Sequence, residues 1–276
     1  MERVTRFAPS PTGHLHLGHA YSALFAEAQG TRFLVRIEDI DTARCRPEFD
    51  EAILDDLSWL GLAWETPVRR QSAHMDDYAG ALNALAARDL LYPCFCTRKD
   101  IQAEITAAGY APHRPDGPVY PGICRHLSSA ERNERLATGA PHALRLKMDK
   151  AIAVTATLTW HDAEAGLQQA RPEIFGDVVL ARKDTPASYH LAVTVDDHLQ
   201  GVTIVTRGQD LFEASHVHRL LQALLGYEAP AYNHHKLLTD AQGKRFAKRD
   251  KAQTLQSLRA AGHTPADVRA MVGWEA

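Results

Sequence analysis

His16 and His19 stand three residues apart, directly after the loop-like segment Pro9-Ser-Pro-Thr-Gly13. At this spacing the two imidazoles share one face of the first turn of a helix. A helix N-terminus presents unpaired backbone N–H groups and partial positive charge, which favour a bound phosphate. Gly13 and Gly18 remove Cβ atoms where a nucleotide has to approach closely. The segment therefore predicts a phosphate site, with a histidine-rich loop before a buried helix as the alternative interpretation.

A second cationic segment lies in the last third of the chain. Between Lys236 and Arg259, seven Lys or Arg residues stand against two Asp residues, a charge of +5 in a chain whose net charge is −3. Asp240-Ala-Gln-Gly243 predicts a turn ahead of the densest part of this run. Such a run is normally a solvated face, but it can also neutralise phosphates. If a nucleic acid binds, we expect its phosphates near this segment, with an affinity that falls as salt is added.

Three of the four cysteines are clustered as Cys94-Phe-Cys96 and Cys124. Zinc prefers four tetrahedral ligands, and thiolates are among its commonest protein ligands. His113 and His126 are the nearby residues whose chemistry most often supplies a fourth ligand. Buried free thiols are the alternative interpretation. Cys45 stands alone in a polar segment and is expected to be a free thiol with no role.

Composition places the chain among ordinary globular proteins. It has 276 residues, of which 45% are hydrophobic and 24% are charged, so disordered and fibrous classes are excluded. The length suggests one or two domains. No apolar stretch reaches the roughly 18 residues that a membrane span needs, and the first residues lack an apolar signal-peptide core. We therefore expect a cytoplasmic protein.

Apolar periodicity and turn residues predict alternating strands and helices over the first 91 residues. The expected strands are Arg3–Ala8 and Thr31–Ile37, and the expected helices are Gly18–Ala28, Pro47–Gly61 and Asp76–Leu91. This alternation is typical of an α/β fold built on a parallel sheet.

Residues 92–125 interrupt the alternation with three cysteines and five prolines. Ser128-Ser-Ala-Glu131 then predicts a capping box at the start of a short helix. Further on, we expect a helix at Leu211–Leu225 and two short helices in the tail. We expect strands at Ala143–Met148, Ile152–Trp160, Asp177–Arg182, His190–Val195, Val202–Thr206 and His234–Leu238. The pattern indicates an α/β nucleotide-binding domain (1–91 and 177–250), a mixed α/β insertion (92–176) and a short helical tail (251–276).

His16-Leu-Gly-His19 resembles the first signature motif of the class I aminoacyl-tRNA synthetases. Four further segments are similar to the glutamyl branch of that family: Arg6–Gly13, Arg36–Asp41, Val195–Gly201 and Thr206–Leu211. The resemblance extends over residues 3–252 and implies a Rossmann-type catalytic domain. It implies ATP binding by His16, Gly18, His19 and Lys248, and catalysis by His16, His19 and Lys248.

The second ATP motif of the family falls at residues 245–249, Arg245-Phe-Ala-Lys248-Arg249. Lys248 aligns with the lysine that contacts the ATP phosphates. Arg245 replaces a lysine of the motif, and Ala247 replaces a serine. Positive charge is therefore kept and one hydroxyl is lost, which predicts slower loop closure and activation more than weaker ATP binding.

The resemblance implies a glutamate pocket formed by Arg6, Phe7, Ala8, Pro9, Ser10, Glu38, Tyr189 and Arg207. Glutamate carries two carboxylates and one ammonium, and arginine binds carboxylates through two parallel hydrogen bonds. We assign Glu38 to the α-ammonium, Arg207 to the γ-carboxylate and Arg6 to the neighbourhood of the α-carboxylate. Glutamine is then disfavoured, because its neutral amide leaves the Arg207 charge unpaired in a desolvated site.

Two further features resemble one subfamily, the glutamyl-Q tRNA(Asp) synthetases. Tyr120 matches an unusual tyrosine ligand of that subfamily, which implies structural zinc held by Cys94, Cys96, Tyr120 and Cys124. Only 27 residues follow Arg249 (276 − 249), too few for the anticodon-binding domain of ordinary glutamyl-tRNA synthetases. The subfamily activates glutamate with ATP and Mg²⁺, without needing tRNA, and transfers it to the cyclopentenediol of queuosine in the anticodon of tRNA(Asp).

The expected partners are therefore ATP, L-glutamate and queuosine-containing tRNA(Asp), and the chain is expected to be a monomer with no membrane partner. Three alternatives are open. The chain could be a truncated glutamyl-tRNA synthetase that charges a tRNA 3′ end, or a non-catalytic tRNA-binding paralogue. A small-molecule ligase with the same phosphate motif is the third, although it gives no reason for the glutamate-type motifs.

Overall fold

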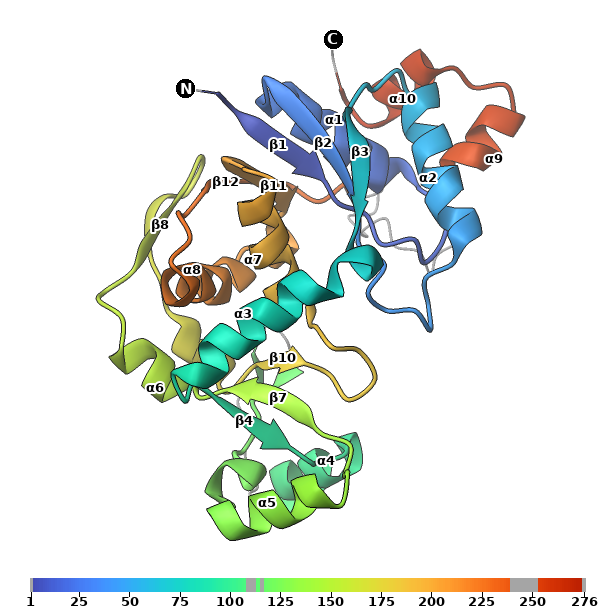
Figure 1. The fold of residues 1–276 in the computed structure, drawn as a ribbon. Coiled ribbons are helices and arrows are strands. Elements are labelled where there is room, and N and C mark those ends of the chain that lie inside the picture. The colour runs from blue at the N-terminus through green and yellow to red at the C-terminus, as the bar shows by residue number, and fades with distance from the viewer. Residues whose placement is uncertain (1, 108–112, 115–116, 239–252, 275–276) are drawn as a thin grey trace.

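The computed structural model describes residues 2–107, 113–114, 117–238 and 253–274. Its N-terminal part is a parallel sheet in the order β1 (Val4–Phe7), β2 (Arg32–Ile37) and β3 (Glu65–Arg70), drawn in blue to cyan in Figure 1. The helices α1 (Leu17–Gln29) and α2 (Pro47–Trp59) connect these strands. The first two strands and helices confirm the sequence-based expectations to within a few residues. All four residues of β1 are buried, as expected for a strand covered on both faces.

A second sheet continues from the first. Its order is β11 (Ile204–Gly208), β12 (Ala231–His235), β8 (Thr159–Asp162) and β9 (Gly166–Gln169), with only the last pair antiparallel. β11 lies beside β1, because the Val4 N–H donates to Thr203 Oγ1 (2.8 Å) and the Thr203 N–H donates to the Val4 carbonyl (3.0 Å). The strand order therefore runs outward in both directions from β1 and β11. In sheets of this kind, ligands bind at such a switch point, at the carboxyl ends of the strands.

The segment between β4 (Leu91–Cys94) and β10 (Val179–Ala181) contains a separate antiparallel sheet, β10-β7-β4, with β7 at Ala143–Leu146. α4 (Arg98–Ala107) and α5 (Ser129–Ala137) lie beyond this sheet in Figure 1. A two-stranded hairpin, β5 (His113–Arg114) and β6 (Gly117–Pro118), belongs to the same segment. The predicted capping box is confirmed: Ser128 accepts from the Glu131 N–H, and the Glu131 carboxylate accepts from the Ser128 N–H.

One predicted strand is a helix. His190–Val195 lies within α7 (Tyr189–Leu199), which Ser188 caps by accepting from the Leu191 N–H. This helix is buried between α3 (Met75–Ala87) and α8 (Ala214–Leu225), and all of its residues from His190 to Asp197 are buried. A helix that is buried on all sides carries no amphipathic period, so its β-branched residues imitate a strand.

The predicted strand Ile152–Trp160 is also wrong over most of its length. Ile152 belongs to the short helix α6 (Met148–Ala153), and the strand β8 begins only at Thr159. The Ala151 N–H donates to the Lys147 carbonyl and the Val154 N–H to the Lys150 carbonyl, so local helical bonds satisfy the backbone here. Likewise, the predicted helix Asp76–Leu91 ends at Ala87, and β4 begins at Leu91.

The tail contains the two predicted short helices, α9 (Leu255–Ala260) and α10 (Pro265–Met271). Leu255, Leu258 and Val268 are buried in the core that α1 and α2 form with the first sheet. The Leu255 N–H also donates to the Leu15 carbonyl (2.9 Å), immediately before the histidine motif. The tail thus braces the loop that carries His16. Among the described residues, no helix has the length and apolarity that crossing a bilayer requires.

Candidate active site

A cavity of about 680 Å³ opens at the carboxyl ends of β1, β2 and β11, where the strand order reverses. All of the predicted glutamate and ATP residues that the structure describes line it: Arg6, Phe7, Ala8, Pro9, Ser10, His16, Gly18, His19, Glu38, Tyr189 and Arg207. Lys248, Arg245, Ala247 and the turn 240–243 lie outside the described residues. The free thiol of Cys45 also lines the cavity, which the sequence did not indicate.

His16 and His19 cap the N-terminus of α1 by hydrogen-bonding to the backbone. His16 Nδ1 accepts from the Gly18 N–H (3.1 Å), and His19 Nδ1 accepts from the His16 N–H (3.2 Å). Because Nδ1 is the acceptor in both rings, each neutral imidazole carries its proton on Nε2. A Cβ at Gly18 would lie 3.1 Å from the His16 ring, which explains the glycine between the two histidines. The motif thus sets both tautomers and supplies two Nε2–H donors.

One end of the cavity is built from paired charges. Arg6 donates through Nε to Asp197 Oδ1 (2.8 Å) and through Nη1 to the Thr206 carbonyl (2.9 Å). Arg36, wholly buried, donates to the same Asp197 oxygen (2.8 Å) and to Glu38 Oε1 (3.2 Å). Burial raises the pKa of Glu38, and the guanidinium groups of Arg36 and Arg6 oppose that rise. The positive charges of Arg6 and Arg36 are therefore paired with the negative charges of Asp197 and Glu38.

The other end is built around one cation with neutral neighbours. Arg207 donates through Nε to His234 Nε2 (3.1 Å), through Nη1 to His218 Nδ1 (3.1 Å) and through Nη2 to Ser215 Oγ (2.6 Å). Its Nη1 also lies 3.4 Å from the Tyr189 hydroxyl. Among the residues that the structure describes, Arg207 has no carboxylate within ion-pair distance, although it is only 7% exposed. A buried cation without a counter-ion favours an anionic ligand.

The histidines beside Arg207 are held in the neutral form. Burial lowers the pKa of His234 to about 4, and the Arg207 charge adds to this effect, against the hydrogen bond that His234 Nδ1 makes to Asp162 (2.8 Å). Burial and Arg207 also lower the pKa of His218 well below its ordinary value. Since arginine can only donate, His234 Nε2 and His218 Nδ1 are both acceptors. His234 therefore donates to Asp162, and His218 Nε2 donates to His190 Nδ1 (3.1 Å).

Tyr189 lies between the two ends of the cavity. Burial raises the pKa of its hydroxyl, on which the charges of Arg207, Glu38 and Arg6 also act. Because the hydroxyl oxygen accepts from Arg207, its proton can be donated to a ligand. The first turn of α7 thus places one neutral donor among three charged side chains.

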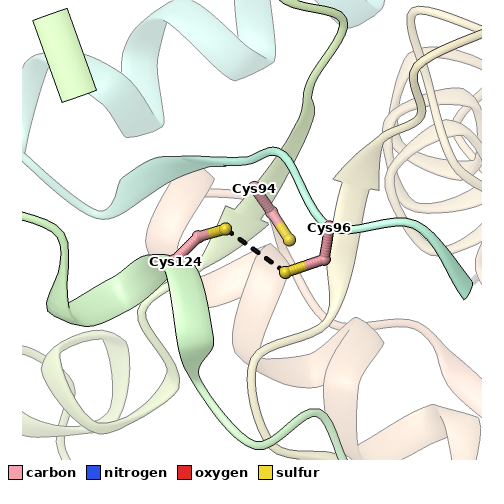
Figure 2. A group of neighbouring side chains, drawn as sticks. All are labelled: Cys94, Cys96 and Cys124. Carbon is pink, nitrogen blue, oxygen red and sulfur yellow. Dashed lines mark hydrogen bonds between the residues drawn. The ribbon is translucent and has the colours of Figure 1, made fainter. Parts of the chain in front are cut away.

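The sulfur atoms of Cys94, Cys96 and Cys124 converge in the segment between β4 and β10, as Figure 2 shows. Cys96 Sγ lies 3.3 Å from Cys124 Sγ, and all three ligand atoms lie within 4.8 Å of one another. The Tyr120 hydroxyl is 3.4 Å from both Cys94 Sγ and Cys96 Sγ. Three thiols and one phenol around a common point suit tetrahedral zinc. His126 is not part of this group, and the side chain of His113 lies outside the described residues.

Several residues that hold Arg6, Glu38 and Arg207 of the cavity in place did not stand out in the sequence as functional. Arg36 and Asp197 lie within motifs that were noted, and His234 begins a predicted strand, but each looks like a surface polar residue when read alone. One available signal is the position of Arg36 in the apolar run Phe33–Ile37, which predicts a buried charge. His218 and Ser215 lie one turn apart on α8, and only tertiary packing brings them to Arg207.

The chain matches the family described as tRNA synthetases class I (E and Q), catalytic domain, over residues 2–273. It therefore belongs to the class I tRNA synthetases and is a ligase of that family. Two of its similar relatives are named glutamyl-Q tRNA(Asp) synthetase. The one from Rhodobacter capsulatus is 50% identical over 98% of this chain and 99% of its own length. The one from Symbiobacterium thermophilum is 44% identical over 95% of this chain and 83% of its own length.

The fold also matches a solved glutamate-tRNA synthetase from Elizabethkingia anophelis. The TM-score is 0.81 at 28% sequence identity, over 99% of this chain and 61% of the other. This chain therefore spans about three fifths of the length of that synthetase. The structural match covers the catalytic-domain fold, with α/β elements and both parallel and antiparallel sheets.

Proposed function

We propose that this chain activates L-glutamate with ATP, without needing tRNA, and transfers it to the queuosine cyclopentenediol in the anticodon of tRNA(Asp). The observation that carries the proposal is the arrangement of charges in the cavity. Arg207, which has no ion-pair partner among the described residues, lines the same cavity as Arg6 and Glu38, which belong to a charge-balanced group. The names of the relatives support the choice of acceptor.

Glutamate complements this arrangement. Its α-ammonium and α-carboxylate together carry no net charge, and they suit the end where Glu38 and Arg6 are already balanced. Its γ-carboxylate brings one extra negative charge, which suits Arg207 and the Tyr189 hydroxyl. Glutamine would leave the Arg207 charge uncompensated, and a buried uncompensated charge is costly.

In the first step, the α-carboxylate attacks the α-phosphorus of ATP in line. The new C(O)–O–P bond forms as the bond to the β-phosphate oxygen breaks, and pyrophosphate leaves. His16 and His19 donate Nε2–H to the phosphates at the N-terminus of α1, and Lys248 adds a further positive charge. Mg²⁺ enters with ATP and neutralises part of the phosphate charge. The protein contribution is positioning and electrostatic stabilisation.

In the second step, a hydroxyl of the queuosine cyclopentenediol attacks the carbonyl carbon of the mixed anhydride. An ester bond forms, the C–O bond to the phosphate breaks, and AMP leaves. The phosphate oxygen of the leaving AMP can take the hydroxyl proton, so the step needs no protein base. The cyclopentenediol has to enter the cavity from solvent, and Arg44 and Arg182 are lining residues whose side chains are exposed.

We assign a structural zinc ion to Cys94, Cys96, Tyr120 and Cys124. Bound there, the ion would cross-link the end of β4 to residues 120–124. We also divide the chain into a Rossmann-type catalytic domain (1–91 and 177–250), a zinc-bearing insertion (92–176) and a tail (251–276). None of the four zinc residues lines the cavity, so the zinc would act on folding rather than on the reaction.

Glutamate-dependent exchange of pyrophosphate into ATP, measured without tRNA, tests the first step. We expect exchange with glutamate and little with glutamine. Its absence would contradict the proposal and favour a non-catalytic tRNA-binding protein.

Charging of tRNA(Asp) with and without queuosine tests the second step. Removal of the 3′-terminal adenosine is the sharper control, because it deletes the ordinary acceptor and leaves queuosine intact. We expect trimmed, queuosine-containing tRNA(Asp) to be charged and queuosine-free tRNA(Asp) not to be. Charging of unmodified tRNA(Glu) at its 3′ end would instead identify a truncated glutamyl-tRNA synthetase.

A further inference from the structure

Asp197 joins two parts of the cavity wall that are far apart in sequence. It lies near the C-terminus of α7 and is 7% exposed. Its two oxygens accept from Arg6 Nε (2.8 Å) and Nη2 (3.3 Å), and Oδ1 also accepts from Arg36 Nη1 (2.8 Å). Arg36 then donates to Glu38 Oε1 (3.2 Å). One carboxylate therefore holds Arg6 directly and Glu38 through Arg36.

We infer that Asp197 is the positioning residue for the end of the cavity that binds the amino-acid backbone of the substrate. The inference rests on the proposed function, since it takes Arg6 and Glu38 as glutamate ligands. An arginine has five N–H donors. Asp197 takes two of those of Arg6, and the Thr206 carbonyl takes a third, which leaves two for a substrate. Asp197 and the Thr206 carbonyl thus fix the orientation of the Arg6 guanidinium and leave two of its N–H groups to bind the substrate.

The charge balance gives Asp197 a second effect. Arg6 and Arg36 stand against Glu38 and Asp197, so these four charges sum to zero before substrate arrives. Without the Asp197 charge, Arg36 would turn toward Glu38 and compete with the substrate ammonium for it. Although burial raises the pKa of Asp197, the two arginines outweigh that effect and leave it below its ordinary value. The carboxylate is therefore ionised at neutral pH.

The neighbouring Asp196 does not share this role. It is wholly buried, but its hydrogen bonds go to Arg69, Gln71 and the Tyr78 hydroxyl. It reaches Arg36 only at 3.7 Å and makes no described contact with Arg6 or Glu38. The two adjacent aspartates therefore differ in function: Asp197 serves the cavity, and Asp196 ties α7 to β3 and α3.

Asp197→Asn tests the inference in the pyrophosphate-exchange assay. It keeps the shape of the side chain and removes its charge. We expect the KM for glutamate to rise about 30-fold, and the KM for ATP and the kcat to change less than about threefold, because the lost interaction acts on binding one substrate. Asp177→Asn is the matched control, since Asp177 is also 7% exposed and contacts an arginine, Arg125, but lies away from the cavity.

An unchanged KM for glutamate in folded Asp197→Asn overturns the inference. So does an equal rise in Asp177→Asn, because the effect would then be one of general stability. If Asp197→Asn does not fold, Arg36→Lys replaces it. Lysine keeps the charge but loses the fork that joins Asp197 to Glu38, and we expect the same KM to rise about tenfold. A wild-type chain that shows no glutamate-dependent exchange contradicts the proposed function, independently of Asp197.

Discussion

The two ends of the cavity hold their arginines in opposite ways. At one end, Arg6 and Arg36 contact the carboxylates of Asp197 and Glu38, so charge is balanced within the protein. At the other end, Arg207 contacts two histidines, a serine and a tyrosine, all of them neutral. The arginines at both ends are buried and held by several hydrogen bonds. The two ends therefore differ in their charge balance and not in how firmly the side chains are held.

This contrast shows how one cavity can recognise a zwitterion and a carboxylate at once. The charge-balanced end gains little binding free energy from a ligand that carries a net charge. It instead orients a ligand that carries one positive and one negative group. An unbalanced end carries the desolvation cost of its cation until an anion arrives, and therefore selects strongly for one. The same residue type thus supplies orientation at one end and specificity at the other.

Removal of the lone cation tests the contrast most severely. In Arg207→Met, we expect kcat/KM for glutamate to fall about 1,000-fold or more, and the preference for glutamate over glutamine to collapse. Exchange assays with both amino acids measure this. If Arg207→Met lowers the activity but keeps the preference for glutamate over glutamine, Arg207 is not the source of that specificity. Arg207→Lys, which keeps the charge without the fork, is expected to retain more of the preference.

Neutralising Glu38 alters the balanced end. Glu38→Gln keeps the shape of the side chain, but it removes one of the carboxylate charges that neutralise Arg36 and offers the substrate ammonium only an amide. We expect kcat/KM for glutamate to fall about 100-fold, with the preference over glutamine unchanged. The two amino acids are compared in the same assay. A loss of the preference here would show that specificity is shared by both ends.

The neutral shell of Arg207 can be weakened without removing the cation. His234→Leu leaves the Arg207 Nε–H without its acceptor, while His218 and Ser215 still hold the guanidinium. We expect the KM for glutamate to rise about tenfold. His216→Leu is the matched control: His216 is a buried acceptor for the Trp160 N–H (3.1 Å) and does not line the cavity. An equal rise in both variants would assign the effect to packing.

The neutral histidines also predict a pH dependence of stability. The pKa of His234 is lowered from 6.5 to about 4, so between these values the unfolded chain binds a proton that the native chain does not. The free energy of unfolding therefore falls as pH falls through this window, by about 2 kcal/mol at pH 5 from this residue alone. Urea denaturation at pH 7 and pH 5 measures the decline. His234→Leu should decline less, and an identical decline would contradict a neutral His234.

The smallest effect on either end is expected from the cysteine cluster, which lies outside both. Removal of the proposed zinc ion by a chelator, or by Cys124→Ser, should lower Tm by several degrees and change the KM for glutamate less than about twofold. Thermal denaturation, zinc content and the exchange assay measure this. Cys45→Ser is the control, because Cys45 is a free thiol outside the cluster and its replacement should leave the zinc content unchanged.

The sequence determined the local chemistry of this protein. Gly18 between two histidines, the turn residues before α1 and the capping box at Ser128 act over a few residues, so their outcomes follow from short-range sterics and hydrogen bonding. The spacing of apolar residues along the chain also predicts the first strands and helices correctly. The same reasoning fails at His190–Val195, for which it predicts a strand. This segment of α7 is buried on all sides, so it lacks the exposed polar face that would reveal a helix.

Only the tertiary structure decided which charges share a partner. Asp197 meets Arg6 and Arg36 across 191 and 161 residues, and His234 meets Arg207 and Asp162 across 27 and 72. No local pattern distinguishes Asp197 from Asp196, since the two are adjacent in one helix and differ only in the side of α7 that each faces. The sign and strength of a buried charge depend on what surrounds it, and sequence spacing carries no information about those surroundings.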